Sequence, residues 1–169
     1  TDTVDGAITN NIRVVSADGS NDTDGIVYTN LASLGNFSSF GDRPVVNTWA
    51  VASGSSTRMI MGGKYPASDV MNYVTLASLG DAIDFGDMSA SSWGRGALSD
   101  PTRTLFFGGS APSATNVIDY VTTASVGNTT DFGDLTSTDF VDSSGSSNSK
   151  RGIAWGYQVN TINQVTIAT

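Results

Sequence analysis

The chain has 169 residues, of which 38% are hydrophobic and only 14% are charged. All sixteen acidic residues are Asp and Lys is scarce, which disfavours helices, while the absence of Cys and His excludes disulfides, thiolate nucleophiles and imidazole-based catalytic or metal sites. A net charge of −8 makes nucleic acid an unsuitable partner, and no apolar run approaches the ~20 residues needed for membrane insertion.

The first distinctive segment is an Asp-rich turn near the N-terminus. Asp18, Ser20, Asp22 and Asp24 alternate along it and Gly25 follows. Oxygen ligands on a sharp turn suit Ca²⁺, so Asp18, Asp22 and Asp24 form a candidate calcium site. No Glu is present to close such a loop, and the same pattern is typical of a solvated Asx turn between strands.

A fifteen-residue segment then occurs three times, at residues 28–42, 73–87 and 120–134, and the three copies align with one another without gaps. Each copy begins with Tyr, contains Ala-Ser and then Gly, and ends in Phe-Gly-Asp. The Tyr and the Phe are twelve residues apart in every copy: Tyr28 and Phe40, Tyr73 and Phe85, Tyr120 and Phe132. A fourth copy begins at Gln164 without its Phe-Gly-Asp half. Repetition of this kind indicates a repeat architecture.

An arginine followed by a short apolar run precedes each copy, and Gly ends or follows the run. The arginines are Arg13, Arg58, Arg103 and Arg151, and two of the runs end in diglycines, Gly62–Gly63 and Gly108–Gly109. This pattern is typical of a buried strand that leads into a tight turn. Further upstream lies a third segment with an aromatic residue, Trp49, Trp93 or Phe140.

Each period of about 45 residues therefore contains four short β segments, and a repeat of this length with four strands is typical of a propeller blade. We predict an all-β propeller of four tandem four-stranded blades, the last incomplete, in one domain spanning 1–169. The expected units are 1–42, 43–87, 88–134 and 135–169. Closure stays open between a segment of a six- or seven-bladed array, a closed four-bladed ring and an array that another subunit completes.

Residues that recur in every unit are expected to be scaffold. We predict that each arginine pairs with an Asp of its own or the adjacent blade and so ties the repeats together, the alternative being a positive ring around an anion. Asp42, Asp87 and Asp134 are expected to cap turns by accepting backbone N–H bonds. The register of Trp49 and Trp93 with Phe140 favours packing between blades, although exposed Trp side chains, Trp155 included, would stack on sugars.

The diglycine, the Tyr about ten residues later and the aromatic residue twelve further on resemble the kelch repeat, with Phe where kelch has Trp. The fuller string Tyr-Val-Thr-x-Ala-Ser-x-Gly resembles repeats in virion structural proteins of marine tailed bacteriophages. This resemblance implies a non-enzymatic particle component, surface-exposed or in the tail, that is assembled in the host cytoplasm. Its implied partners are other virion proteins or copies of itself, and a host glycan or receptor.

Two other functions stay open. A capsid decoration or collar protein would differ from a tail fibre or surface appendage only in what it contacts. A propeller glycosidase would need acids that break the repeat symmetry, and Asp139 and Asp142 in the last unit are such acids.

Overall fold

The computed structural model describes residues 6–17, 24–33, 35–45, 49–157 and 159–167, which form β strands joined by turns and loops. Within this part of the chain no helix is present, and so none that is long and apolar enough to cross a membrane. Fifteen strands are assigned there, and they form four antiparallel sheets in chain order. The predicted all-β propeller of four tandem blades is confirmed.

Each sheet is a meander in which consecutive strands pair. The first blade contains β1 (Gly6–Thr9), β2 (Arg13–Ala17), β3 (Gly25–Asn30) and β4 (Ser38–Asp42). The second contains β5 (Val51–Gly54), β6 (Arg58–Gly62), β7 (Ser68–Thr75) and β8 (Ile83–Ser92). The third contains β9 (Gly96–Ser99), β10 (Arg103–Phe107), β11 (Val117–Thr122) and β12 (Thr130–Asp134). The last has three described strands, β13 (Ser144–Ser147), β14 (Arg151–Trp155) and β15 (Asn163–Thr166).

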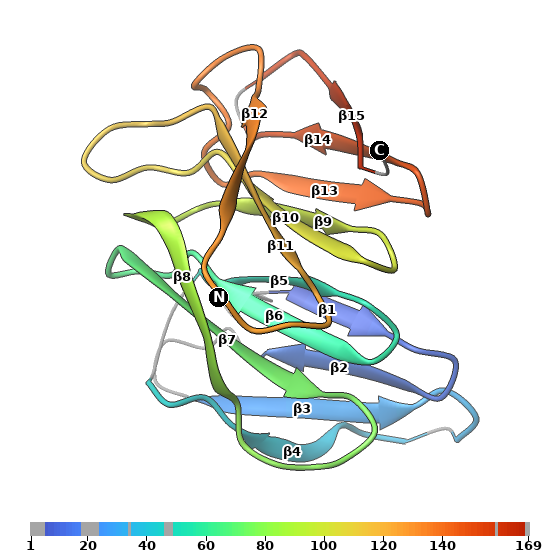
Figure 1. Cartoon of the computed structure of the whole chain (residues 1–169). Coiled ribbons are helices and arrows are strands. Elements are labelled where there is room, and N and C mark those ends of the chain that lie inside the picture. Colours follow the sequence, from blue (N-terminus) through green and yellow to red (C-terminus); the bar gives the residue numbers. More distant parts are fainter. Residues whose placement is uncertain (1–5, 18–23, 34, 46–48, 158, 168–169) are drawn as a thin grey trace.

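The blades are arranged as a fan around their first strands. The inner strands β1, β5, β9 and β13 contact one another in that order. Figure 1 shows the sheets spreading outward from this row, with the first blade at one end of the fan and the last blade at the other. The middle two blades are therefore covered on both faces, and each terminal blade is covered by a neighbour on one face.

The hydrophobic core lies between the blades, because alternate side chains of each second strand point to opposite faces. Val15 and Ala17 of β2 pack with Met59 and Met61 of β6 in the first interface. Ile60 packs with Phe106 in the second interface. Leu105 and Phe107 pack with Ala154 in the third. The same strand positions thus build three successive interfaces.

The recurrent Arg, Tyr and Phe side chains contact one another within each of the first three blades. The guanidinium carbons of Arg13, Arg58 and Arg103 lie 5.1, 4.6 and 5.0 Å from the ring centroids of Tyr28, Tyr73 and Tyr120. Each Tyr ring in turn meets the edge of Phe40, Phe85 or Phe132, with centroids 6.0, 5.6 and 5.8 Å apart. The repeat therefore places a cation–π contact and an edge-to-face pair in each of these three blades.

The same arginines also tie each blade to the next. Their Nη1 atoms donate to the main-chain carbonyls of Leu76, Thr123 and Ile167, at 3.3, 3.2 and 3.0 Å. The sequence predicts aspartate partners here, and for Arg13 and Arg58 that prediction is wrong. A carbonyl suffices because every blade offers it at the same place whatever its side chains are. Arg151 is exposed on the last blade, where Gln164 takes the Tyr position.

The Phe-Gly-Asp motif forms an edge that the next blade covers. The amides of Gly80 and Ala82 donate to the carbonyls of Phe40 and Asp42. One interface further on, Gly127 and Thr129 donate in the same way to the carbonyls of Phe85 and Asp87. The loop between the third and fourth strands of one blade thus pairs with the outer edge of the preceding blade.

The motif's Asp residues enter this contact through their backbone. The amide of Asp42 donates to the Asp81 carboxylate, and that of Asp87 donates to Asn128, both at 3.0 Å. We expected the carboxylates of these Asp residues to accept hydrogen bonds from backbone N–H groups. In this contact their own backbone N–H groups donate instead to side chains of the next blade. The Gly of the motif is needed for the close approach, because a Cβ on Gly86 would lie 2.5 Å from the Gly127 carbonyl group.

Both diglycines lie at the end of the second strand, where the chain turns beside the segment that enters the next blade. Gly63 faces the aliphatic part of Arg95. Gly108 has a φ of 65°, and a Cβ there would lie 2.1 Å from the carbonyl oxygen of Phe140. Any larger residue at Gly108 would therefore force these two blades apart.

Candidate functional site

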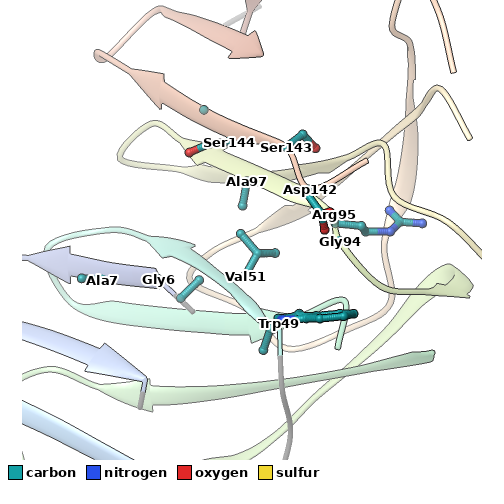
Figure 2. Close-up of a pocket in the computed structure, with 13 residues that line it drawn as sticks. Gly6, Ala7, Trp49, Val51, Gly94, Arg95, Ala97, Asp142, Ser143 and Ser144 are labelled. Atoms are coloured by element: carbon teal, nitrogen blue, oxygen red, sulfur yellow. The ribbon is translucent and has the colours of Figure 1, made fainter. Parts of the chain in front are cut away.

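A hollow of about 570 Å³ lies where the inner strands begin. All four blades contribute to its lining (Figure 2). The lining residues include Gly6 and Ala7 of the first blade, Val51 of the second, Ala97 of the third and Ser144 of the last. Most of these residues are small, so backbone groups form much of the wall. The hollow is therefore a product of the propeller arrangement, and no single repeat contains it.

Three equivalent turns enter this hollow in a left-handed backbone conformation. Trp49, Gly94 and Asp142 each lie five residues before the end of an inner strand, with φ values of 60°, 66° and 49°. All three line the hollow. Such a conformation costs a bulky non-Gly residue on the order of 1–3 kcal/mol. Trp and Asp at this position give the site the asymmetry that the repeated scaffold lacks.

Trp49 is also part of an aromatic cluster with Tyr65 and Trp93. Its ring centroid lies 5.4 Å from that of Tyr65 and 5.6 Å from that of Trp93, and the Tyr65 and Trp93 rings are 6.3 Å apart, edge to face. Trp49 and Tyr65 are exposed, and Trp93 is half-buried. Exposed aromatic rings with an indole N–H and a phenol O–H suit a ligand that is apolar on one face and polar at its edge.

Trp49 and Trp93 belong to neighbouring units and their rings are in contact, so this pair does meet between blades, although Trp49 remains exposed. Phe140 is instead fully buried in the third interface, and Trp155 is exposed on the last blade. The structural register explains the difference. Trp49, Trp93 and Phe140 lie five, six and seven residues before the end of their inner strands, so they are not equivalent. Counting residues from the preceding Phe-Gly-Asp motif does not reveal that these positions differ, because the connecting segments differ in length.

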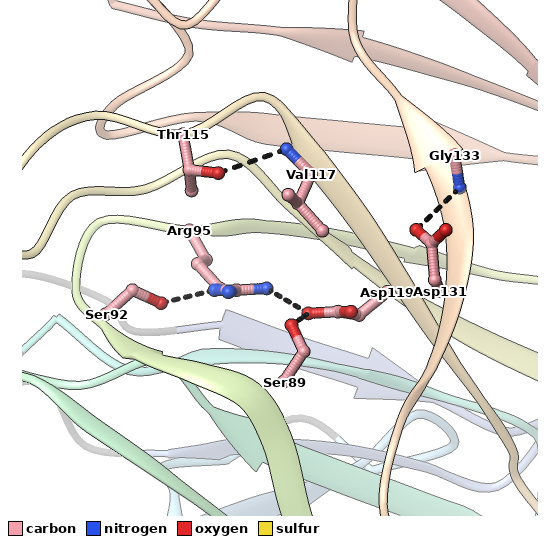
Figure 3. Close-up of polar contacts among 8 residues, drawn as sticks. All are labelled: Ser89, Ser92, Arg95, Thr115, Val117, Asp119, Asp131 and Gly133. Carbon is pink, nitrogen blue, oxygen red and sulfur yellow. Dashed lines mark hydrogen bonds and ion pairs between the residues drawn. The ribbon is translucent and has the colours of Figure 1, made fainter.

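A buried ion pair anchors the segment that carries Trp93. Arg95 Nη1 lies 2.9 Å from Asp119 Oδ2, and both side chains are almost wholly inaccessible to solvent. The Ser89 hydroxyl donates to the same carboxylate oxygen at 2.7 Å, and Arg95 Nε donates to the Ser92 hydroxyl (Figure 3). The pair holds the chain entering β9 against β11, and so fixes one side of the hollow.

Sequence reasoning missed Tyr65, Arg95 and Asp119. Tyr65 follows the diglycine of the second blade, and a hairpin brings that position to the same end as the start of the inner strand. Asp119 carried a usable signal, because it is a lone acid inside a strand, between Ile118 and Tyr120. A charge at such a position calls for a buried partner.

The asymmetric acids of the last unit lie beside a second pocket of about 380 Å³, which Asp139, Asp142 and Tyr157 line. Asp142 also reaches the main hollow, where its Oδ1 would lie 2.8 Å from a Cβ on Gly94. The Asp139 carboxylate accepts a 2.9 Å hydrogen bond from the Ser137 hydroxyl. The two carboxylates thus share one pocket.

The proposed calcium site stays a prediction. Asp18 and Asp22 lie outside the described residues. Asp24 is described, and its main-chain carbonyl accepts a 2.7 Å hydrogen bond from the amide of Arg43. Elsewhere in the described ranges, no three acidic side chains gather so as to hold a metal ion.

In comparisons with known proteins, the chain matches no protein-family model and no curated protein. The fold is that of a β-propeller, and one fold of this kind can host many unrelated functions. The fold therefore assigns no function, and the residues at the hollow carry the functional information.

Proposed function

We propose that this chain is a non-enzymatic interaction protein of a virus particle, a tail fibre or surface appendage component that binds a host-surface glycan through Trp49, Tyr65 and Trp93. The observation that carries the glycan part is the cluster of three aromatic rings in mutual contact, of which Trp49 lines the hollow. The particle assignment rests on the resemblance of the Tyr-Val-Thr repeats to virion proteins. Recognition loops on a rigid scaffold are a common arrangement for such a role.

The ligand class follows from charge and ring chemistry. The net charge of −8 disfavours an anionic polysaccharide, so we infer a neutral hexose or N-acetylhexosamine. The C–H face of such a sugar would stack on the exposed ring of Trp49. Its hydroxyls would meet the phenol of Tyr65 and the main-chain groups at the start of the inner strands. Neutral ring stacking needs neither a metal ion nor a titrating side chain.

The experiment is a titration of the purified chain with oligomers of N-acetylglucosamine, galactose and glucose. Binding is measured by tryptophan fluorescence and by calorimetry. We expect binding of at least one oligomer, and a loss of roughly tenfold or more in affinity for Trp49→Ala. Tyr65→Phe keeps the ring, so it should lose less than Tyr65→Ala. Leu79→Ala removes an exposed apolar side chain that lies outside the cluster and outside both pockets, and it serves as the control. Absence of binding to every oligomer, or full affinity in Trp49→Ala, would contradict the proposal.

A second candidate function is hydrolysis of a host polysaccharide, which the shared pocket of Asp139 and Asp142 favours. Retaining and inverting glycosidases use two such carboxylates. Release of reducing ends from an oligomer that binds, and its loss in Asp142→Asn, would support this function over simple binding. Antibody labelling of intact particles distinguishes a tail fibre or surface appendage from a decoration or collar protein, because it shows where on the particle the chain lies.

A further inference from the structure

The last blade presents to solvent a set of side chains whose equivalents are buried in every other blade. Ile153, Trp155 and Ile162 are 43%, 39% and 68% exposed. Ile153 corresponds to Val15, Ile60 and Leu105, which are completely buried. Ile162 corresponds to Ile26, Met71 and Ile118, all 4% exposed or less. We call Ile153, Trp155 and Ile162 the trailing face.

The first blade shows the complementary exposure on its opposite side. Leu31 and Phe37 are 55% and 57% exposed. They take the positions of Leu76 and Ala82 in the second blade, which are buried beneath the first blade. In the third and fourth blades, Thr123 and Ile167 take the position of Leu31 and are also buried. We call Leu31 and Phe37 the leading face.

We propose that the trailing face of one molecule docks against the leading face of a second copy of this chain, as a fourth interface of the kind that already joins its blades. The proposed interface continues the series of three interfaces inside the molecule. In each of them, a trailing set of side chains meets a leading set at the same repeat positions. This chain carries one unused set of each kind.

Arg151 gives the interface a specific polar contact. The arginines before it donate to the carbonyls of Leu76, Thr123 and Ile167 in the following blade. In the first blade, the equivalent carbonyl belongs to Leu31. Arg151 of one copy is therefore expected to donate to the Leu31 carbonyl of the other. A main-chain acceptor is available whatever residue stands there, so this contact does not depend on charge complementarity.

The contact joins different surfaces of the two molecules, so it is heterologous. Such contacts make a closed ring when the rotation returns to the start, and otherwise an open filament. Either product removes the exposed apolar faces from water, which supplies the driving force. The inference is independent of glycan binding, because the trailing and leading faces do not include the aromatic cluster.

The test is the oligomeric state of the 169-residue chain, measured by sedimentation velocity and light scattering over a range of concentrations. We expect dimers or larger species that dissociate on dilution. Leu31→Asp and Ile153→Asp should each limit assembly, since both side chains are exposed in the isolated molecule and can change without disturbing its core. Val126→Asp, at an exposed loop position of the third blade, is the matched control. Circular dichroism melting verifies that every variant is folded.

Mixing the two variants tests the head-to-tail geometry. Leu31→Asp retains an intact trailing face and Ile153→Asp retains an intact leading face, so together they should form a one-to-one complex although neither self-associates. Arg151→Ala should weaken assembly about tenfold, as expected for loss of one charged hydrogen bond. The proposal is overturned if the wild type stays monomeric at its highest soluble concentration. It is also overturned if both Asp variants assemble as the wild type does, or if the mixture stays monomeric.

Discussion

The guanidinium of Arg58 lies over the ring of Tyr73, with its carbon 4.6 Å from the ring centroid, while Nη1 of the same side chain donates to the Thr123 carbonyl in the next blade. One arginine therefore stabilises its own blade and the joint to the next. This double contact explains why the repeat keeps Arg and Tyr at a fixed register.

Replacing Arg58 should be costly in a way that replacing Arg151 is not. We expect Arg58→Ala to lower the free energy of unfolding by ~2 kcal/mol, the sum of a charged hydrogen bond and a cation–π contact. Arg151→Ala changes the same repeat position on the last blade, where the side chain is exposed, and should cost less than about 0.5 kcal/mol. Urea denaturation in dilute solution measures both. Equal losses would show that the contacts between blades contribute little.

The stability of the folded protein should depend strongly on the buried pair of Arg95 and Asp119. Asp119→Ala leaves a buried guanidinium without its carboxylate and should cost about 3–5 kcal/mol. Asp131→Ala removes an exposed carboxylate that accepts from Gly133 and should cost under about 0.5 kcal/mol. The double variant Arg95→Met/Asp119→Leu should recover much of the loss. A double variant as unstable as Asp119→Ala would contradict the role of the unpaired charge.

The Gly of the Phe-Gly-Asp motif allows a controlled test of close approach between blades. Gly86 and Gly133 have nearly the same φ, 137° and 139°, but Gly86 faces the Gly127 backbone while no atom lies within 4 Å of a Cβ on Gly133. Gly133→Ala should cost only the backbone strain, about 1–3 kcal/mol. Gly86→Ala should cost clearly more by thermal or urea unfolding. Similar costs for the two variants would mean that the loop moves away freely.

Lys64 should give the stability a pH dependence. Burial, and secondarily the nearby Arg43 guanidinium, lower the pKa of Lys64 from its usual 10.5. The folded protein therefore holds this proton less tightly than the unfolded chain does. The cost to stability is fully present below the folded pKa, fades as the pH rises toward 10.5 and is gone above it.

Lys64→Met should accordingly raise the unfolding midpoint at neutral pH, with a gain that shrinks in alkaline solution. Lys150→Met, at an exposed site, controls for the change in net charge. Comparing each variant with the wild type at the same pH removes the effect of tyrosine ionisation. A gain for Lys64→Met that is constant with pH would trace to the added methionine rather than to the lost charge.

Several features of the fold were predictable because they are local and repeated. The Arg-led apolar runs became second strands, and the Tyr and Phe-Gly-Asp segments became third and fourth strands. Glycine at the turns and alternating side chains along short runs are enough to specify an antiparallel meander. A period of about 45 residues then fixes four strands to a blade.

The partners of the recurrent side chains could not be predicted in the same way. Arg58 reaches a main-chain carbonyl of another blade, and backbone atoms leave no signature in the sequence. The β5–β6 hairpin brings Tyr65 beside Trp49, and the packing of the next blade brings Trp93 to the same place. The aromatic site is therefore a property of the packed blades.

The amino-acid sequence is enough to specify a tandem array of antiparallel blades, because hydrophobic alternation and turn chemistry act over a few residues. The tertiary structure alone decided which of the repeated side chains are buried. Ile60 and Ile153 follow their arginines at the same distance, yet the first is completely buried and the second is 43% exposed. The physical reason is that burial depends on the adjacent blade, which Ile60 has and Ile153 lacks.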